Sequence, residues 1–115
     1  MPSFIEQIQA IYDSMPLEKL QVPEWETAET GEVFVYYKPA TQHELELVTR
    51  EIPENAKGSR FNVQLVILKA LDSEGRRLFV NGDADKLSRK GFANVVNRLA
   101  NAMVKTPTIE GAEGN

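Results

Sequence analysis

The segment RFNVQLVILKAL, residues 60–71, constrains the fold most, because it is the most hydrophobic stretch of this 115-residue chain. Phe61, Leu65 and Leu68 recur at the spacing of a buried helix. The β-branched residues in the same stretch would instead suit a central strand that returns through DSEG to pair with RLFV. Periodicity alone cannot separate these alternatives for a short apolar run, and we favour a helix over residues 60–71.

The N-terminus carries a clear helix signal. Ser3 followed by Glu6 is the pattern of a capping box, in which the two side chains bond each other's backbone amides. We therefore predict a helix over residues 3–15, which Pro16 ends. Its apolar residues fall on one helical face at Phe4, Ile8, Ile11 and Met15.

A β-hairpin is predicted over residues 22–37. Two short runs rich in β-branched and aromatic residues, 22–27 and 32–37, flank the sequence AETG, whose Gly31 suits a turn. The aromatic residues of the hairpin are expected to pack across the strands rather than to stack on nucleic-acid bases.

A second capping box, Thr41 with Glu44, then predicts a helix over residues 41–52.

The C-terminal part predicts two more helices. The first spans residues 83–90, with Asn81 or Asp83 as its N-cap and Gly91 as its C-cap. The second spans residues 92–104 and carries its apolar stripe at Phe92, Val95, Val96, Leu99, Ala102 and Met103.

Together these elements predict a mainly α (α+β) fold with about five helices and one β-hairpin near the N-terminus. Residues 1–104 are expected to form a single domain, and the polar, glycine-rich residues 105–115 a flexible tail.

The chain has no cysteine, which excludes disulfides and cysteine-type zinc sites and is compatible with a reducing cytoplasm. Neither a secretory signal nor a run of about 20 apolar residues is present, so we expect a soluble intracellular protein.

The acid-rich stretch LDSEGRRLFVNGDADKLSRKG, residues 71–91, resembles a metal loop only superficially. A calcium loop of the EF-hand type requires glycine at about the sixth position and glutamate at about the twelfth. DSEGRRLFVNGD has its glycine at the fourth position and arginines among the ligand positions, and NGDADKLSRKGF lacks the closing glutamate. We interpret the acids as a turn (Asp72, Glu74) and a helix start (Asp83, Asp85).

No pattern in the chain indicates catalysis. The only histidine, His43, has no second histidine or cysteine with which to share a metal. The serines lack the G-x-S-x-G context of a nucleophile, and no glycine-rich phosphate loop is present. We therefore expect a protein that is not an enzyme and uses no cofactor or metal.

The net charge of −4 argues mildly against a dedicated nucleic-acid binder, but it hides an asymmetry. Residues 76–105 carry seven basic residues and two acids. A DNA-binding regulator is thus an alternative, with residues 83–104 as a helix-turn-helix-like segment. Its base-contacting side chains would be Asn94, Asn97, Arg98 and Asn101.

Residues 33–104 resemble a known family, the tail assembly chaperones of long non-contractile-tailed (siphovirus-type) bacteriophages. The resemblance rests on four parts in order: an apolar helix ending in Asp-x-x-Gly, a short Leu-Phe segment, an acid-rich helix start and an amphipathic terminal helix. Here these parts are residues 63–71 with 72–75, Leu78 with Phe79, residues 83–87 and residues 92–104. The upstream sequence VFVYYKPATQHELELV is also similar, with a strand leading into a capped helix.

The resemblance implies a non-catalytic protein of the host cell cytoplasm that is absent from the finished virion. It would bind the tape measure protein during tail assembly, with tail tube subunits as a further partner and self-association left open; no membrane or nucleic-acid partner is implied. An exposed apolar or mixed groove is expected to cover the partner's helices. Our candidate partner-binding residues are the basic strip Arg76, Arg77, Lys86, Arg89 and Lys90, for which a solvated helix face is the simpler interpretation.

The family also implies a longer product made by programmed frameshifting near the C-terminus. Glu113, Gly114 and Asn115 can be encoded by codons that contain the slippery heptamer G-GGA-AAN. The gene sequence tests this hypothesis directly, because other synonymous codons, or a closed −1 frame downstream, would contradict it.

Overall fold

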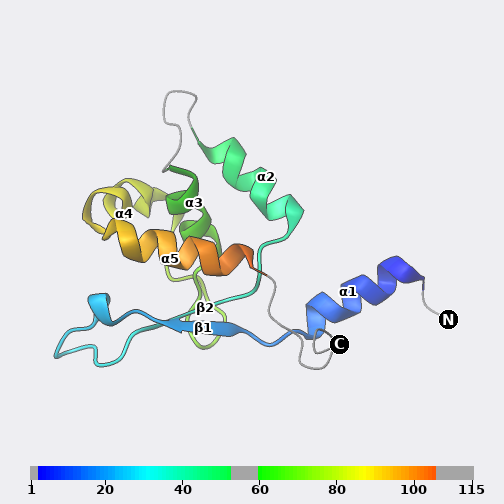
Figure 1. Ribbon diagram of the computed structural model, residues 1–115, viewed down its shortest axis with the longest axis horizontal. Helices are drawn as coiled ribbons and strands as arrows, with labels where there is room; N and C mark the ends of the chain where they lie inside the picture. The colour runs from blue at the N-terminus through cyan, green and yellow to red at the C-terminus, as the bar shows by residue number, and fades with distance from the viewer. Residues whose placement is uncertain (1–2, 53–59, 106–115) are drawn as a thin grey trace.

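The computed structural model of the chain describes residues 3–52 and 60–105, and within them it has the predicted mainly α architecture with one hairpin near the N-terminus (Figure 1). The predicted tail lies outside the described residues from 106 onward, as does the predicted polar loop at 53–59. The elements in order are α1 (Phe4–Ser14), β1 (Glu18–Gln21), the 3-10 helix η1 (Pro23–Trp25), β2 (Phe34–Tyr37), α2 (Gln42–Glu51), α3 (Arg60–Lys69), the 3-10 helix η2 (Asn81–Asp83), α4 (Ala84–Lys90) and α5 (Ala93–Val104).

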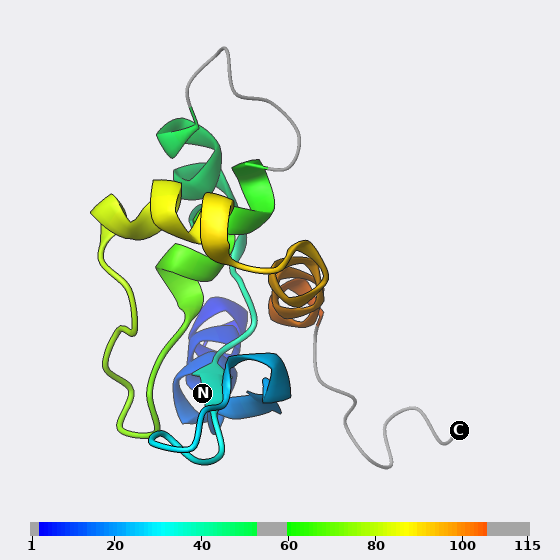
Figure 2. The same cartoon turned by 90° about the vertical axis from the view of Figure 1, so that its left-hand side faces the viewer.

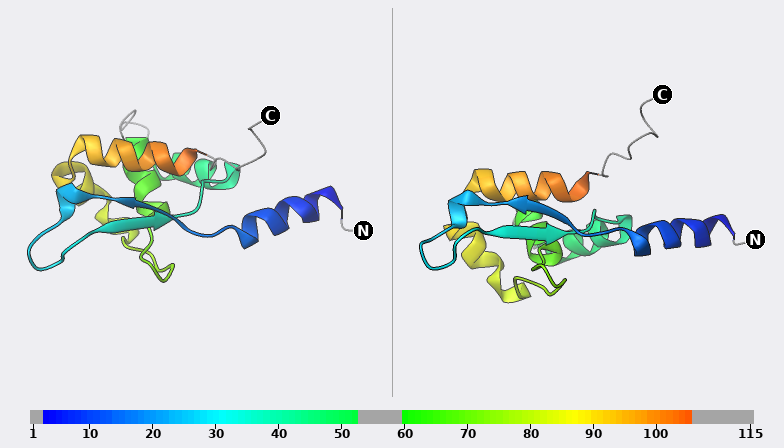
Figure 3. Two further views of the ribbon diagram at one scale, coloured as in Figure 1. Left: turned by 60° about the horizontal axis from the view of Figure 1, so that its bottom comes forward. Right: turned by 90° about the horizontal axis from the view of Figure 1, so that it is seen from below.

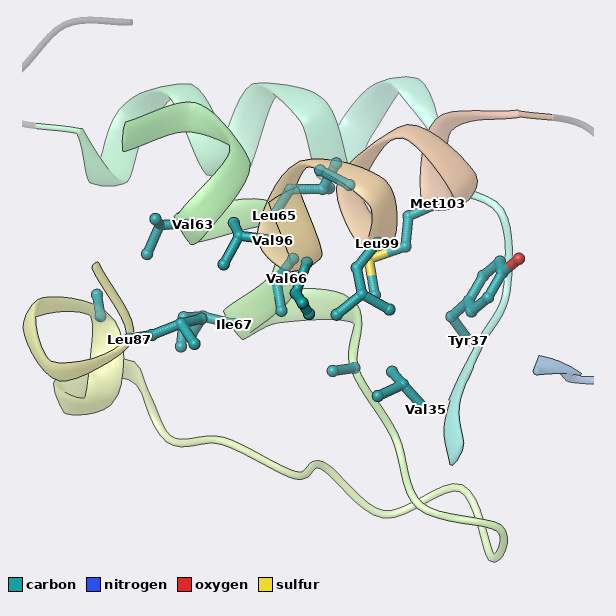
Figure 4. Packing of buried hydrophobic residues seen from close by; sticks show 14 of the residues in the cluster. Val35, Tyr37, Val63, Leu65, Val66, Ile67, Leu87, Val96, Leu99 and Met103 are labelled. Atoms are coloured by element: carbon teal, nitrogen blue, oxygen red, sulfur yellow. The ribbon is translucent and has the colours of Figure 1, made fainter. Parts of the chain in front are cut away.

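The apolar segment forms the central helix α3, which confirms the predicted helix. Helices α2, α4 and α5 pack around it (Figures 1 and 2). Val66 and Ile67 of α3 are buried together with Leu99 and Met103 of α5 (Figure 4). The buried apolar residues of α3 do not lie along one face of the helix, which explains why three other helices pack against it.

Helix α3 ends at Lys69, two residues before the predicted end, and the chain then becomes extended. Leu71 forms isolated antiparallel bridges with Tyr36 of β2 and with Arg77. Its backbone exchanges hydrogen bonds of 2.8 and 2.9 Å with that of Tyr36. Leu71, the last residue of the apolar segment, therefore pairs as the strand alternative predicted for the whole segment. Its backbone hydrogen bonds to Tyr36 connect the helices to the hairpin.

The first strand of the hairpin lies earlier than predicted. β1 pairs antiparallel with β2 from Glu18↔Tyr37 to Gln21↔Phe34, whereas residues 23–25, predicted as strand, form η1. Because Pro23 has no backbone N–H, it cannot continue the ladder as a donor, and it starts a 3-10 turn instead. The second strand is confirmed, and Gly31 adopts φ 67° in the turn as expected.

Both capping boxes are confirmed. The Glu6 amide donates to the Ser3 hydroxyl at 3.3 Å, and the Glu44 amide donates to the Thr41 hydroxyl at 3.2 Å. Asp83 and Gly91 stand at the N-cap and C-cap positions of α4 as predicted, but the Asp83 side chain forms no capping hydrogen bond with that helix. Asp83 accepts from the Val80 amide at 3.0 Å and so caps η2, the turn before α4.

Gly91 ends α4 without the left-handed conformation that glycine commonly adopts after a helix. Its φ is −76°, which any residue can adopt. A Cβ at this position would lie 2.7 Å from the Leu87 carbonyl oxygen and 2.8 Å from the Leu87 Cδ1. Glycine is therefore required because the chain leaves α4 so close to Leu87, in the last turn of the same helix, that a side chain has no room.

Replacing Gly91 with alanine should lower the free energy of unfolding by about 1–3 kcal/mol, because the new methyl group forces the backbone at Leu87 to move. The matched control is Gly82→Ala, where an added Cβ meets nothing within 4 Å. It should change stability by no more than about 0.5 kcal/mol. Urea denaturation of both variants measures the difference, and equal effects would show that the contact at Gly91 is not restrictive.

Candidate functional site

Two of the five predicted partner-binding residues are engaged within the chain. The Arg76 guanidinium pairs with Asp72 and Glu74 in its own turn. The Arg77 guanidinium donates to the Ile67 carbonyl oxygen of α3 at 2.8 Å. Arg76 and Arg77 therefore make contacts within the segment between α3 and α4, and both remain exposed at the surface.

The other three, Lys86, Arg89 and Lys90, are exposed on α4 and form no ion pair with any residue in the described part of the chain. Lys86 and Lys90 border a hollow of about 470 Å³. We call this the α4 hollow; it is lined by Trp25, Leu78, Phe79, Asp83, Lys86, Leu87, Lys90 and Gly91. Two residues of the predicted basic strip thus stand at the border of this hollow.

The floor of the α4 hollow is built from segments far apart in the sequence. Trp25 of η1 meets Phe79 edge to face, with ring centroids 6.4 Å apart. Leu87 contributes from α4 and is buried, whereas Leu78 is 43% exposed at the border. Aromatic and aliphatic side chains with lysines around them can bind an apolar side chain that is flanked by acids.

A second surface, which the basic strip did not indicate, is the apolar face of α1. No residue of this helix is buried, and the helix projects from the rest of the molecule (Figures 1 and 3). We call its large apolar residues the α1 face; they are Phe4 (74% exposed), Ile5 (61%), Ile8 (47%) and Ile11 (53%). The sequence shows the stripe but not its exposure, because the same spacing is typical of a helix that packs on a core.

Among residues 3–52 and 60–105, it is the C-terminal end of α1 that contacts the body of the protein, through Tyr12. The Tyr12 hydroxyl donates to the Pro39 carbonyl oxygen at 3.3 Å. The Lys38 ammonium donates to the Tyr12 carbonyl oxygen at 3.1 Å and lies 4.9 Å from the centroid of the Tyr12 ring. These contacts hold one end of the helix and leave the α1 face free along its length.

The side chains that would contact DNA in the alternative hypothesis have other neighbours in the structure. Arg98 binds both carboxylate oxygens of Glu24, at 2.8 and 3.0 Å, and Asn97 accepts from Asn62 at 2.8 Å. Asn94, Asn97, Arg98 and Asn101 line a hollow of about 630 Å³ between α5 and the hairpin, together with Leu20 of β1. Two of these four side chains, Asn97 and Arg98, thus already have hydrogen-bond partners within the chain.

The acids of residues 72–85 have the structural roles predicted from the sequence. Asp72 accepts from the amides of Glu74 and Arg76, and the Arg76 amide is the main cause that lowers the pKa of Asp72. Asp85 pairs with Arg60 at 2.6 Å, and this hydrogen bond lowers the pKa of Asp85. In the parts of the chain that the structure describes, no three acidic or histidine side chains gather as a metal site would require.

Comparison of this chain with protein-family models, with curated proteins and with solved structures finds no match. Among the residues described, no helix has the length and apolar character needed to cross a membrane. The α1 face and the α4 hollow are therefore the features of the molecule that bear on its function.

The Glu24–Arg98 pair predicts a specific loss of stability in acid. The Arg98 guanidinium lowers the pKa of Glu24 from 4.5 to about 2. A carboxyl group with a lowered pKa in the folded state stabilises the fold above its unfolded pKa and loses this contribution as pH falls through the folded pKa. The free energy of unfolding should thus decline between pH 4.5 and about 2, less steeply in Glu24→Gln than in the wild type.

Glu29→Gln is the matched control, because Glu29 is an exposed acid of the hairpin turn. Thermal unfolding, followed by circular dichroism across this pH range, measures how steeply the stability of the wild type and of each of the two variants declines with pH. If Glu24→Gln and the wild type declined in parallel, the pair would not contribute to acid stability.

Proposed function

We propose that this protein is a non-catalytic assembly chaperone that covers apolar helices of a partner, and specifically a phage tail assembly chaperone that binds the tape measure protein. The proposal includes the tail tube subunits as a further partner. It places the protein in the host cell cytoplasm during tail assembly and outside the finished virion. It requires no cofactor.

The exposed α1 face is the observation that carries this proposal. Monomeric proteins normally bury large apolar residues that recur along one helix, and a contiguous apolar surface marks a place where another molecule binds. On α1 the residues Phe4, Ile8 and Ile11 follow one another in steps of four and three and remain exposed. These apolar side chains would be removed from water only when a partner covers the α1 face.

The spacing of the α1 face suits a helical partner in particular. Steps of four and three are those of the a and d positions of a coiled coil, which insert between the side chains of a facing helix. The two acids of α1, Glu6 and Asp13, lie on the opposite side of the helix from this stripe. The α1 face is therefore uncharged, and it can bind many apolar helices, as a chaperone of a long helical protein requires.

The α4 hollow supports the same class of function. Its apolar floor and its lysines, Lys86 and Lys90, offer a second, more selective contact for an apolar segment with acidic neighbours. Neither surface contains the convergent polar groups that chemistry on a substrate would need. No contact of α5 favours the DNA-binding regulator over this proposal.

Replacing Ile8 with aspartate tests the role of the α1 face. The charge would have to be buried in the complex, so capture of a tape measure protein should fall at least about tenfold. Because Ile8 is exposed in the free protein, the stability of the fold should change by no more than about 0.5 kcal/mol. Co-expression and pull-down measure the capture.

Gln9→Asp is the control, since it adds the same charge to the exposed part of the same helix, outside the stripe. It should bind the partner as the wild type does. Equal losses in the two variants would contradict a role for the α1 face. Salt-dependent retention of duplex DNA, or transcription genes as neighbours in place of a long helical reading frame, would count against the chaperone and for the regulator.

A further inference from the structure

The α4 hollow has room for a large apolar side chain. Trp25 and Phe79 meet edge to face on its floor, beside the buried side chain of Leu87. Its volume of about 470 Å³ lies within the range of about 300–1,000 Å³ that ligand pockets occupy. The elements η1 and α4, which both contribute to it, lie at one end of the long axis and α1 lies at the other (Figure 3). The hollow is therefore a surface separate from the α1 face.

The charges at this hollow are unbalanced. Lys86 and Lys90 border it, and neither forms an ion pair within the described part of the chain. The acid among the lining residues, Asp83, already accepts a hydrogen bond from the Val80 amide at 3.0 Å. The chain as a whole has a net charge of −4, so this excess of positive charge is local. It would attract an acidic partner to this place rather than to the surface in general.

The spacing of the two lysines describes the partner further. Lys86 and Lys90 are four residues apart on α4, which places their Cβ atoms about 5–6 Å apart on one side of the helix. Two acids that are one turn apart on a helix have the same separation. Two acids that are two residues apart in an extended segment have nearly the same separation, about 6.4–6.8 Å. An acidic segment of either kind can therefore reach both ammonium groups.

We propose that the α4 hollow binds an acidic segment of a partner protein, in which aspartate or glutamate flanks a large apolar side chain. The apolar side chain enters the hollow beside Trp25 and Leu78, and the carboxylates pair with Lys86 and Lys90. This inference rests on the proposed function, because it specifies which segment of the chaperone's partner the hollow selects. It requires nothing of the α1 face. One side chain in one hollow is a small contact, so the affinity for an isolated peptide should be weak.

The fluorescence of Trp25 tests the proposal on the full chain, because Trp25 is the only tryptophan of the sequence and lines the hollow. The probe is the acetylated peptide Asp-Glu-Leu-Phe-Glu-Asp, and the control peptide is Lys-Lys-Leu-Phe-Lys-Lys. Neither peptide contains tryptophan. The acidic peptide should shift the emission of Trp25 until the signal saturates, and the basic peptide should bind at least about tenfold more weakly.

Reversing the charge of the two lysines gives the decisive result. Lys86→Glu combined with Lys90→Glu should bind the basic peptide more tightly than the acidic one, which a merely structural role of the lysines would not produce. Arg89→Glu is the matched control, because it reverses a charge on the same helix outside the hollow. It should change the affinity for the acidic peptide by no more than about threefold.

A second pair of variants tests the apolar part of the hollow. Leu78→Asn should weaken binding of the acidic peptide several-fold. Val80→Asn should leave it unchanged, because Val80 is also exposed but does not line the hollow. All the side chains replaced are exposed, so each variant should keep the wild-type circular dichroism spectrum. If the double glutamate variant does not fold, Lys86→Gln combined with Lys90→Gln replaces it and should weaken the acidic peptide several-fold.

Four outcomes would overturn the proposal. They are an acidic peptide that leaves Trp25 emission unchanged at every concentration, equal affinity of the wild type for both peptides, an unchanged preference in the folded double variant, and tighter binding of an oligothymidylate than of the acidic peptide.

The proposed function fails in a different way. Ile8→Asp should bind the acidic peptide as the wild type does, since Ile8 does not line the hollow. If the wild type binds this peptide but captures no tape measure protein, the proposed function is wrong and the specificity of the hollow stands. If capture depends on Ile8 while the acidic peptide does not bind, the inference about the hollow is wrong and the role of the α1 face stands.

Discussion

The burial of α3 is the constraint on which the rest of the structure depends. Its residues Val63, Leu65, Val66 and Ile67 are buried, and α2, α4 and α5 exclude water from them. The chain leaves the helix through Leu71, whose backbone pairs with Tyr36 and so attaches the hairpin to the helices. One apolar segment thus determines both the helical packing and the position of β2.

A single charged contact fixes how α2 lies on α3. Lys69 is the buried charged residue of the core, and its ammonium lies 2.8 Å from the Glu44 carboxylate. The same carboxylate oxygen accepts from the Thr41 amide at 3.0 Å, within the capping box that begins α2. A buried ammonium without its partner is strongly destabilising. The start of α2 is therefore held at one place along α3, and the signal that begins the helix also positions it.

The sequence predicts best what is decided locally. The starts of α1 and α2 follow from capping boxes that span three residues, and the turn at Gly31 follows from one backbone conformation. The first strand was misplaced because β-branched and aromatic residues favour a strand, whereas Pro23 ends the ladder. The α4 hollow could not be predicted, since Trp25 and Phe79 meet only through the packing of distant segments. The exposure of the α1 face was hidden for the same reason.

The attachment of α1 at one end links its stability to its binding. Helices shorter than about 12–15 residues are marginal in water without tertiary packing, and α1 has 11 residues. Its capping box and the contacts of Tyr12 support the two ends, but no core supports the middle. A molecule that covers the α1 face supplies the packing that the other helices obtain from α3. Because whatever binds only the helical form also stabilises it, occupation of the α1 face should order the helix and protect its amides from exchange.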